Sequence, residues 1–281
     1  MEIVLGFLIA VAIGITGVGA GVITAPVLIL FFHVPAAHAV GTALAFSVAV
    51  KMLVVPMQIY RKQVDYRVLA YLLTGGVPGV LAGSLILAKL NTKGTQGILY
   101  AVLGSTVVVM AAMNLYRLWL KPAQEGTRDL AHWLPAIALP IGAEVGFSSA
   151  GAGALGSLVL LWLTPLSAAR VVGTDLFFGL CLSLIGSGFQ LTAGNYDGAI
   201  LTQLVIGGLI GAFAGTYLAA ITPQRAFRVV LSLWLITLGI QLAWSGVQQW
   251  QPLVHTSSSE FTQPVRAGAS TQVRPSTQPR Q

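Results

Sequence analysis

Charged residues are scarce in this 281-residue chain. Asp, Glu, Lys and Arg together make up 8% of the sequence, whereas they make up about 25% of an ordinary soluble domain. A water-soluble fold cannot cover its surface with so few charges, so the composition excludes a soluble enzyme. The mean hydropathy of +0.82 indicates instead a protein that lies in a membrane.

Cysteine is nearly absent as well, because Cys181 is the only one and lies in an apolar segment. A single cysteine cannot form a disulfide within the chain or build a multi-cysteine metal site. The sequence also lacks the GxxxxGK[ST] pattern of P-loop proteins, so we expect no intrinsic ATP hydrolysis. We predict neither a cofactor nor a metal site.

Long apolar runs are abundant, and a bilayer span needs about 20 such residues. Charges and turn residues divide the chain into eight apolar segments, which predicts an all-α, polytopic integral membrane protein. The segments cover residues 3–32, 36–57, 68–88, 95–118, 133–163, 168–191, 198–221 and 225–247. The first and fifth are near 30 residues long and contain glycine clusters, which predicts that both helices are broken.

The two halves of the chain match at a constant offset of 132 residues, which predicts a duplication of four segments. We divide the chain into a first membrane repeat (1–119), a central polar loop (120–132), a second membrane repeat (133–250) and a disordered polar tail (251–281). The tail cannot bury enough apolar surface to offset its ordering entropy. The matched residues include Gly19, Ala20 and Gly21 with Gly151, Ala152 and Gly153; Val40, Gly41 and Thr42 with Val172, Gly173 and Thr174; Gln58 with Gln190; and Asp65 with Asp197.

Two further triplets of glycines match at the same offset. Gly75, Gly79 and Gly83 are spaced four residues apart, and Gly207, Gly211 and Gly215 repeat the pattern. At this spacing the glycines share one helix face, which predicts close packing of neighbouring helices in lipid.

The net charge of +7 comes from basic residues in short loops and in the tail, which is typical of membrane topology and not of a nucleic-acid partner. If the first and fifth segments are hairpins that return to their side of entry, one side of the membrane carries nine basic residues and the other two. If every segment crosses fully, the sides carry six and five. The positive-inside rule therefore favours re-entrant first segments, two inverted repeats and termini outside the cytoplasm.

The glycine clusters in the broken segments indicate an anion site. A helix that restarts after a break leaves unpaired N–H groups at its N-terminus, where the helix dipole attracts anions. In two inverted halves, two such ends meet near the midplane, which suits a small anionic substrate; the alternative is a kink that serves packing alone. The candidate binding residues are Thr16, Gly17, Gly19, Gly21 and Thr24 in the first copy and Ser148, Ser149, Gly151 and Gly153 in the second.

A few polar residues lie inside the predicted spans, where they are costly and often functional. Lys51 either snorkels to the interface or lines an anion path, and the equivalent residues Gln58 and Gln190 are candidates to line the same path. Glu144 and Asp175 are candidates for proton coupling, because a carboxylate in an apolar segment is most easily buried in its protonated form. A structural ion pair or hydrogen bond is the alternative for both carboxylates.

Three motifs over residues 3–247 resemble the TauE/SafE family of bacterial membrane transporters: Gly17-Val-Gly19-Ala-Gly21-x-x-x-x-Pro26, Ala39-Val40-Gly41-Thr42 and Val172-Gly173-Thr174. The resemblance implies a secondary transporter, often an exporter, of sulfite, sulfonates or related organosulfur anions across the bacterial inner membrane. The chain departs from the usual pattern at Ala20, where a third glycine is common; at Leu158, the position equivalent to Pro26; and at Asp175, where a small polar residue is frequent.

We therefore expect a multi-pass exporter of a small anion, with the substrate and the lipid bilayer as its partners; a homodimer is compatible with the sequence. One alternative is a membrane enzyme that acts on lipid phosphate, but this chemistry needs clustered carboxylates, an arginine clamp and usually a metal. The other is a passive anion channel, which only uphill flux driven by a proton gradient distinguishes from a transporter.

Overall fold

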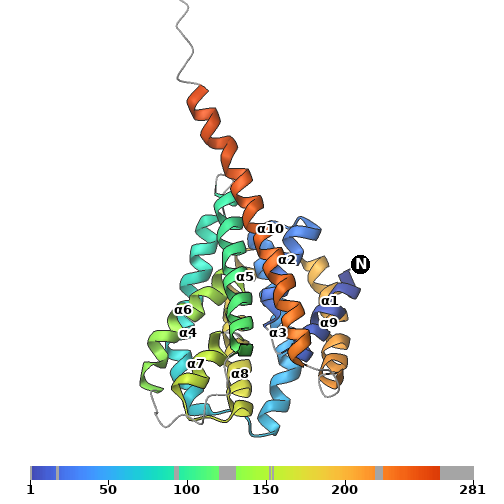
Figure 1. Ribbon diagram of the computed structural model, residues 1–281, viewed down its shortest axis with the longest axis vertical. Coiled ribbons are helices and arrows are strands. Elements are labelled where there is room, and N and C mark those ends of the chain that lie inside the picture. The colour runs from blue at the N-terminus through green and yellow to red at the C-terminus, as the bar shows by residue number, and fades with distance from the viewer. Residues whose placement is uncertain are drawn as a thin grey trace, which may run out of the picture.

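The fold is a bundle of helices in the described part of the chain (Figure 1). The computed structural model describes residues 2–16, 19–91, 95–119, 131–151, 153, 155–218 and 224–259. Its helices are α1 Glu2–Thr16, α2 Ala20–Phe32, α3 Ala36–Tyr60, α4 Tyr66–Leu90, α5 Gln96–Trp119, η1 Ala131–Trp133, α6 Leu134–Ser148, α7 Leu155–Leu163, α8 Ala168–Thr192, α9 Gly198–Leu218 and α10 Gln224–Ser259.

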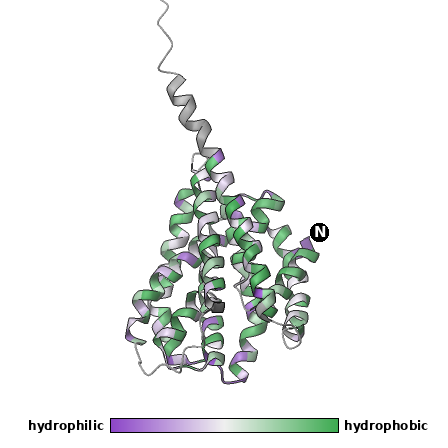
Figure 2. Ribbon diagram, in the orientation of Figure 1, coloured by the Kyte–Doolittle hydropathy of each residue, from purple (hydrophilic) through white to green (hydrophobic). Residues whose placement is uncertain are grey.

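Six of the described helices are long and apolar enough to cross a membrane: α3, α4, α5, α8, α9 and α10. Large apolar side chains such as Leu184, Phe213 and Trp244 lie on the surface of the bundle, and Figure 2 shows hydrophobic residues along most of its length. Apolar side chains on the outside are expected where lipid replaces water as the solvent. The predicted all-α, polytopic membrane protein is confirmed.

Both long segments are interrupted where the glycine clusters lie. The first segment is divided between α1 and α2, and the fifth between α6 and α7. Ser149 ends α6 with a left-handed backbone (φ 67°). Val4 of α1 and Phe31 and Phe32 of α2 line one surface pocket, so the start of α1 lies beside the end of α2. These two helices therefore form a hairpin.

The helices of the two halves coincide at the offset of 132 residues. α3 covers Ala36–Tyr60 and α8 covers Ala168–Thr192, so both of their ends differ by this number. The same holds for α1 (Glu2–Thr16) and α6 (Leu134–Ser148). The duplication is predicted from matched glycines and polar residues, so the agreement of the helix ends is independent evidence for it.

The glycine triplets bring helices of different halves into backbone contact. A Cβ added to Gly75 of α4 would overlap the Pro135 carbonyl of α6, and one added to Gly83 would overlap the Ala143 carbonyl. Since the contacts advance along both helices together, α4 and α6 run in the same direction. The equivalent contacts join α9 to α1, where Gly207 lies against Ile3 and Gly215 lies against Val11. The predicted close packing of these faces is confirmed.

Equivalent helices of the two halves run antiparallel to each other. Gly41, near the start of α3, lies against Asn195, just after α8 ends, and Gly173, near the start of α8, lies against Gln63, just after α3 ends. The contacts between α5 and α10 likewise advance in opposite directions along the two helices: Gly104 lies against Gly239 and Ala243, and Gly246 lies against Gly97 and Ala101.

Two reciprocal hydrogen bonds fasten each of α3 and α8 to the connection that follows the other helix. The Asp197 N–H donates to the Thr42 hydroxyl oxygen (3.1 Å), and the Asp65 N–H donates to the Thr174 hydroxyl oxygen (2.9 Å). Each aspartate also caps the next helix, because its carboxylate accepts two N–H groups from the first turn of α4 or α9. The paired Val-Gly-Thr motifs and aspartates of the sequence therefore serve packing.

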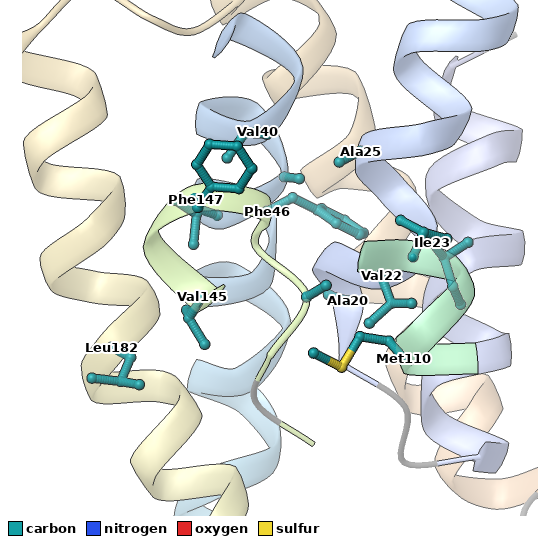
Figure 3. Close-up of a cluster of buried hydrophobic side chains, with 14 of the residues drawn as sticks. Ala20, Val22, Ile23, Ala25, Val40, Phe46, Met110, Val145, Phe147 and Leu182 are labelled. Carbon is teal, nitrogen blue, oxygen red and sulfur yellow. The ribbon is translucent and has the colours of Figure 1, made fainter. Parts of the chain in front are cut away.

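Figure 3 shows a cluster of buried hydrophobic side chains to which the broken segments contribute. Its labelled side chains come from α2 (Ala20, Val22, Ile23, Ala25), α3 (Val40, Phe46), α5 (Met110), α6 (Val145, Phe147) and α8 (Leu182).

The last helix is longer than the sequence predicted. α10 continues to Ser259, so nine residues of the predicted polar tail at 251–281 are helical. Most of the predicted central loop and residues 260–281 lie outside the described residues.

Candidate functional site

A small interior cavity lies at the turn of the α1–α2 hairpin. Its volume is about 150 Å³, which is below the 300–1,000 Å³ range of drug-sized pockets and suits an anion of a few heavy atoms. Helices α3, α8 and α9 complete its walls. The lining residues are Ala10, Ile13, Gly14, Gly19, Ala20, Val50, Lys51, Val54, Gln58, Val172, Leu176 and Ala212.

The N-terminus of α2 contributes positive backbone dipoles to this cavity. Gly19 is the N-cap residue of α2 and makes no side-chain capping bond, and both Gly19 and Ala20 line the cavity. The first N–H groups of a helix have no intrahelical partners and carry a partial positive charge, so they bind anions. The start of α2 at the first glycine cluster therefore lines the cavity, and its role in anion binding stays a prediction.

Lys51 supplies a full positive charge to the same cavity. Its side chain is 7% exposed, and its Nζ donates to the Ser183 hydroxyl (3.1 Å), which lies 3.3 Å from the Ser47 hydroxyl. Lys51 and Ser183 are equivalent positions at the offset of 132 residues, so the ammonium group lies between the two halves. This burial argues against snorkelling to the interface, and a role of Lys51 in an anion path stays a prediction.

Asp175 belongs to α8, and its carboxylate lies beside the start of α7. Its carboxylate accepts a hydrogen bond from Ser157, and a Cβ added to Gly156 would overlap one of its oxygens. Since α7 begins at Leu155, a carboxylate of the chain itself lies beside the N-terminal turn of α7. The same carboxylate attracts Lys51 electrostatically. The two helix N-termini are therefore not equivalent: that of α2 faces the cavity, and that of α7 faces Asp175.

Glu144 makes its contacts close to the break after α6. Ser148 donates its hydroxyl to Glu144 Oε1 (2.6 Å) and accepts the N–H of Ala150 (3.2 Å), which fixes the chain where it leaves the helix. A Cβ added to Gly151 would lie 3.0 Å from the Glu144 side chain. This carboxylate and Ser148 thus stabilise the break, and neither is among the residues that line the cavity.

The remaining candidates in the glycine clusters have structural contacts. Gly21 is buried, and a Cβ there would overlap the carbonyl and hydroxyl oxygens of Ser149. Thr24 donates its hydroxyl to the Ala20 carbonyl within its own helix (2.8 Å). Gly153 has φ 104°, a backbone conformation that glycine adopts without strain. These residues allow the two breaks to pack against each other.

The two glutamines occupy different surroundings although their positions are equivalent. Gln58 lines the cavity. Gln190 is fully buried and accepts a hydrogen bond from the Asn195 side chain (2.9 Å). Two further candidates lie outside what the structure describes: Gly17 as a whole, and the side chain of Thr16.

Sequence reasoning missed Ser183 and Ala212, which complete the surroundings of the lysine and the cavity wall. The repeat could have pointed to Ser183, because Ser183 is the residue that matches Lys51 at the offset of 132. The apolar wall residues give no comparable signal, since their side chains do not differ in kind from those that face lipid.

Residues 2–242 match the family described as "Sulfite exporter TauE/SafE". The chain belongs to this family. It is 25% identical over 252 residues to the "Probable membrane transporter protein YjnA" of Bacillus subtilis (strain 168), a match that covers 85% of this chain and 98% of the relative. It is 26% identical over 231 residues to the "Probable membrane transporter protein YdhB" of the same organism, covering 81% and 93%. No solved structure matches the chain.

Membership of the TauE/SafE family makes the chain a multi-pass membrane transporter. The family resemblance drawn from the paired glycine and Val-Gly-Thr motifs is thereby confirmed. Within the described part of this TauE/SafE chain, helix dipole, charge and space coincide in the cavity with Gly19, Lys51 and Gln58.

Proposed function

We propose that this protein is a secondary transporter that exports a small anion, such as sulfite or a sulfonate, across the bacterial inner membrane. The observation that carries the proposal is the buried Lys51 beside the uncapped N-terminus of α2, in a cavity of about 150 Å³. A lysine at the centre of a membrane helix costs about 3 kcal/mol on insertion scales, so its presence marks an ion path. A monovalent or divalent oxyanion would pair with the Lys51 ammonium group and accept hydrogen bonds from the first N–H groups of α2.

Alternating access is the mechanism that we infer for the export. It is supported by the antiparallel packing of α3 with α8 and of α5 with α10, which is the relation that two inverted repeats would give their equivalent helices. The α1–α2 hairpin, with its turn at the cavity, agrees with a re-entrant first segment. With hairpins in both halves, the basic loops would gather on the cytoplasmic side.

Asp175 is our candidate for coupling the anion to a proton. Its carboxylate lies near enough to Lys51 to attract the ammonium group. Arrival of an anion adds a negative charge to this pair, and protonation of Asp175 would restore neutrality in a medium where net charge is costly. The anion and the proton would then cross together, so a proton gradient drives both toward the alkaline side, and export by this route needs an outward gradient of the anion. Glu144 stays a second candidate; it accepts hydrogen bonds from Ser148 beside the break and from Thr106 of α5.

A membrane enzyme that acts on lipid phosphate is less well supported. Its chemistry needs several carboxylates or an arginine clamp at one place. The cavity lining that the structure describes offers Lys51 and Gln58 as its polar side chains, which can bind an anion but cannot transfer a phosphoryl group.

The test is a flux assay with the purified protein in proteoliposomes. Sulfite, an organic sulfonate, sulfate and chloride should be compared with and without a proton gradient. We expect accumulation of sulfite or the sulfonate against its concentration gradient when the proton gradient is imposed. Flux that only equilibrates the anion would identify a channel, and absence of flux for all four anions would refute the proposal.

A further inference from the structure

A second, larger hollow adjoins the cavity on the side of Arg61. Its volume is about 480 Å³, and it lies between the C-terminal halves of α3 and α9. It shares Val54, Gln58 and Ala212 with the interior cavity. Its lining residues are Leu53, Val54, Met57, Gln58, Arg61, Ala212, Phe213 and Tyr217. The two hollows therefore meet at a common wall of three residues.

The polar side chains of both hollows follow one face of α3. Lys51, Gln58 and Arg61 are separated by seven and three residues, spacings that place side chains on the same side of a helix. Arg61 is exposed at the end of the helix, and Lys51 is buried. Lys51 and Arg61 are ten residues apart, which is about 15 Å along a helix axis. A positive residue thus marks each end of a route, with a glutamine between them.

The equivalent place in the other half is closed. Gln190 corresponds to Gln58, but it is fully buried and its Oε1 accepts the Asn195 side chain (2.9 Å). Gly186 corresponds to Val54, and a Cβ added there would lie 3.2 Å from the Val80 side chain. Val80 in turn corresponds to Ala212. The residues equivalent to the three that border both hollows are therefore buried, and two of them, Gly186 and Val80, lie side by side.

The difference concerns side chains and not the backbone. The Gln63 N–H donates to the Gln58 carbonyl (3.0 Å), and the Asn195 N–H donates to the Gln190 carbonyl (2.9 Å), so both helix ends have the same geometry. The Gln58 Oε1 is buried without a hydrogen-bond partner among the described residues, whereas the Gln190 Oε1 is bonded to Asn195 and its Nε2 is the atom that lacks a partner there. A buried amide oxygen that lacks a partner costs about 1–3 kcal/mol, and a ligand or water would remove this cost.

We propose that the structure is in a state open toward Arg61, and that Gln58 and Gln190 are equivalent gating residues of the anion path. In this state Gln58 borders the open route, and Gln190 is held by Asn195, five residues further along the chain, where the equivalent route is closed. In the opposite state the two glutamines exchange these roles. The inference rests on the proposed transport function, but its test does not measure transport.

The test measures the accessibility of single cysteines in membrane vesicles. With Cys181→Ala as the background, Gln58→Cys and the matched Gln190→Cys are exposed to 2-sulfonatoethyl methanethiosulfonate, an anionic thiol reagent that does not cross membranes. Arg61→Cys identifies the side of the membrane on which the route opens. On that side, we expect Gln58→Cys to react about tenfold or more faster than Gln190→Cys, since a minor open state holds 0.1–10% of the population.

A second pair guards against a local effect of either substitution: Val54→Cys should react and Gly186→Cys should not. Methanesulfonate should slow the labelling of Gln58→Cys; sulfite is unsuitable as a protectant, because it attacks thiol reagents. Equal labelling at the two glutamines would overturn the proposal. Labelling of Gln58→Cys by lipid-soluble N-ethylmaleimide alone would also overturn it, because the larger hollow would then belong to the lipid phase. If the labelling pattern holds while proteoliposomes show no flux, the transport function fails and the access route stands.

Discussion

The reciprocal threonine bonds give the sharpest prediction about what holds the two halves together. Thr42 and Thr174 are fully buried, and each accepts the backbone N–H of an aspartate beyond the opposite helix, at 3.1 and 2.9 Å. Replacement of either threonine by valine keeps the shape but leaves that N–H without an acceptor. The loss of a hydrogen bond to a buried group costs about 1–3 kcal/mol.

The two bonds lie at opposite ends of antiparallel helices, so their effects should be independent. We expect Thr42→Val and Thr174→Val each to lower the free energy of unfolding by about 1–3 kcal/mol, and the double variant to lower it by about the sum. Equilibrium unfolding of the purified protein in mixed micelles, by titration with a denaturing detergent, measures this. Thr42→Ser, which keeps the acceptor, and Thr202→Val, at an exposed position, are the controls.

If Thr42→Val is as stable as Thr42→Ser, the N–H groups find another partner and the reasoning is wrong. A double variant that costs no more than one single variant would show that the two ends of the helix pair do not act independently.

Two further predictions concern the breaks and the coupling. Gly21→Val should abolish transport without preventing membrane insertion, because the valine side chain would overlap Ser149. The control Gly188→Ala should transport normally, since nothing lies within 4 Å of a Cβ there. Normal sulfite flux in Gly21→Val would refute this account of the hairpin. Asp175→Asn should remove the dependence of uptake on the proton gradient, while Glu144→Gln should retain it; the reverse result, read from uptake at graded external pH, would move the coupling to Glu144.

Much of the fold could be predicted from the sequence because the repeat carries its signal in unusual residues. Matched glycines located both breaks, and the long apolar runs located the membrane helices. The offset also paired Thr42 with Thr174 and Asp65 with Asp197 before any geometry was known. It did not show that each threonine binds the aspartate of the other half, because a sequence match gives equivalence and not contact.

The site was predicted less completely. Gly19, Lys51 and Gln58 meet in one cavity, but Ser148, Gly153 and the other candidates of the second glycine cluster do not line it. The reason is Asp175: a carboxylate that is distant in sequence from α7 lies beside the N-terminus of that helix. Hydropathy and spacing along one helix cannot reveal which helix end another helix will neutralise. The sequence likewise could not decide whether Lys51 is buried or reaches the interface, because its burial depends on how α8 packs against α3.

The most direct test of the central claim is the binding of sulfite to Lys51→Met, compared with the wild type and with Lys51→Arg. A hydrogen bond to a charged group contributes about 1.5–3 kcal/mol, so we expect the dissociation constant to rise about 10- to 150-fold in Lys51→Met. The arginine variant should keep most of the affinity, and Lys89→Met, which removes an exposed lysine near the end of α4, should not change it. Unchanged sulfite binding in Lys51→Met would contradict the claim that this buried charge, at the N-terminus of α2, holds the transported anion.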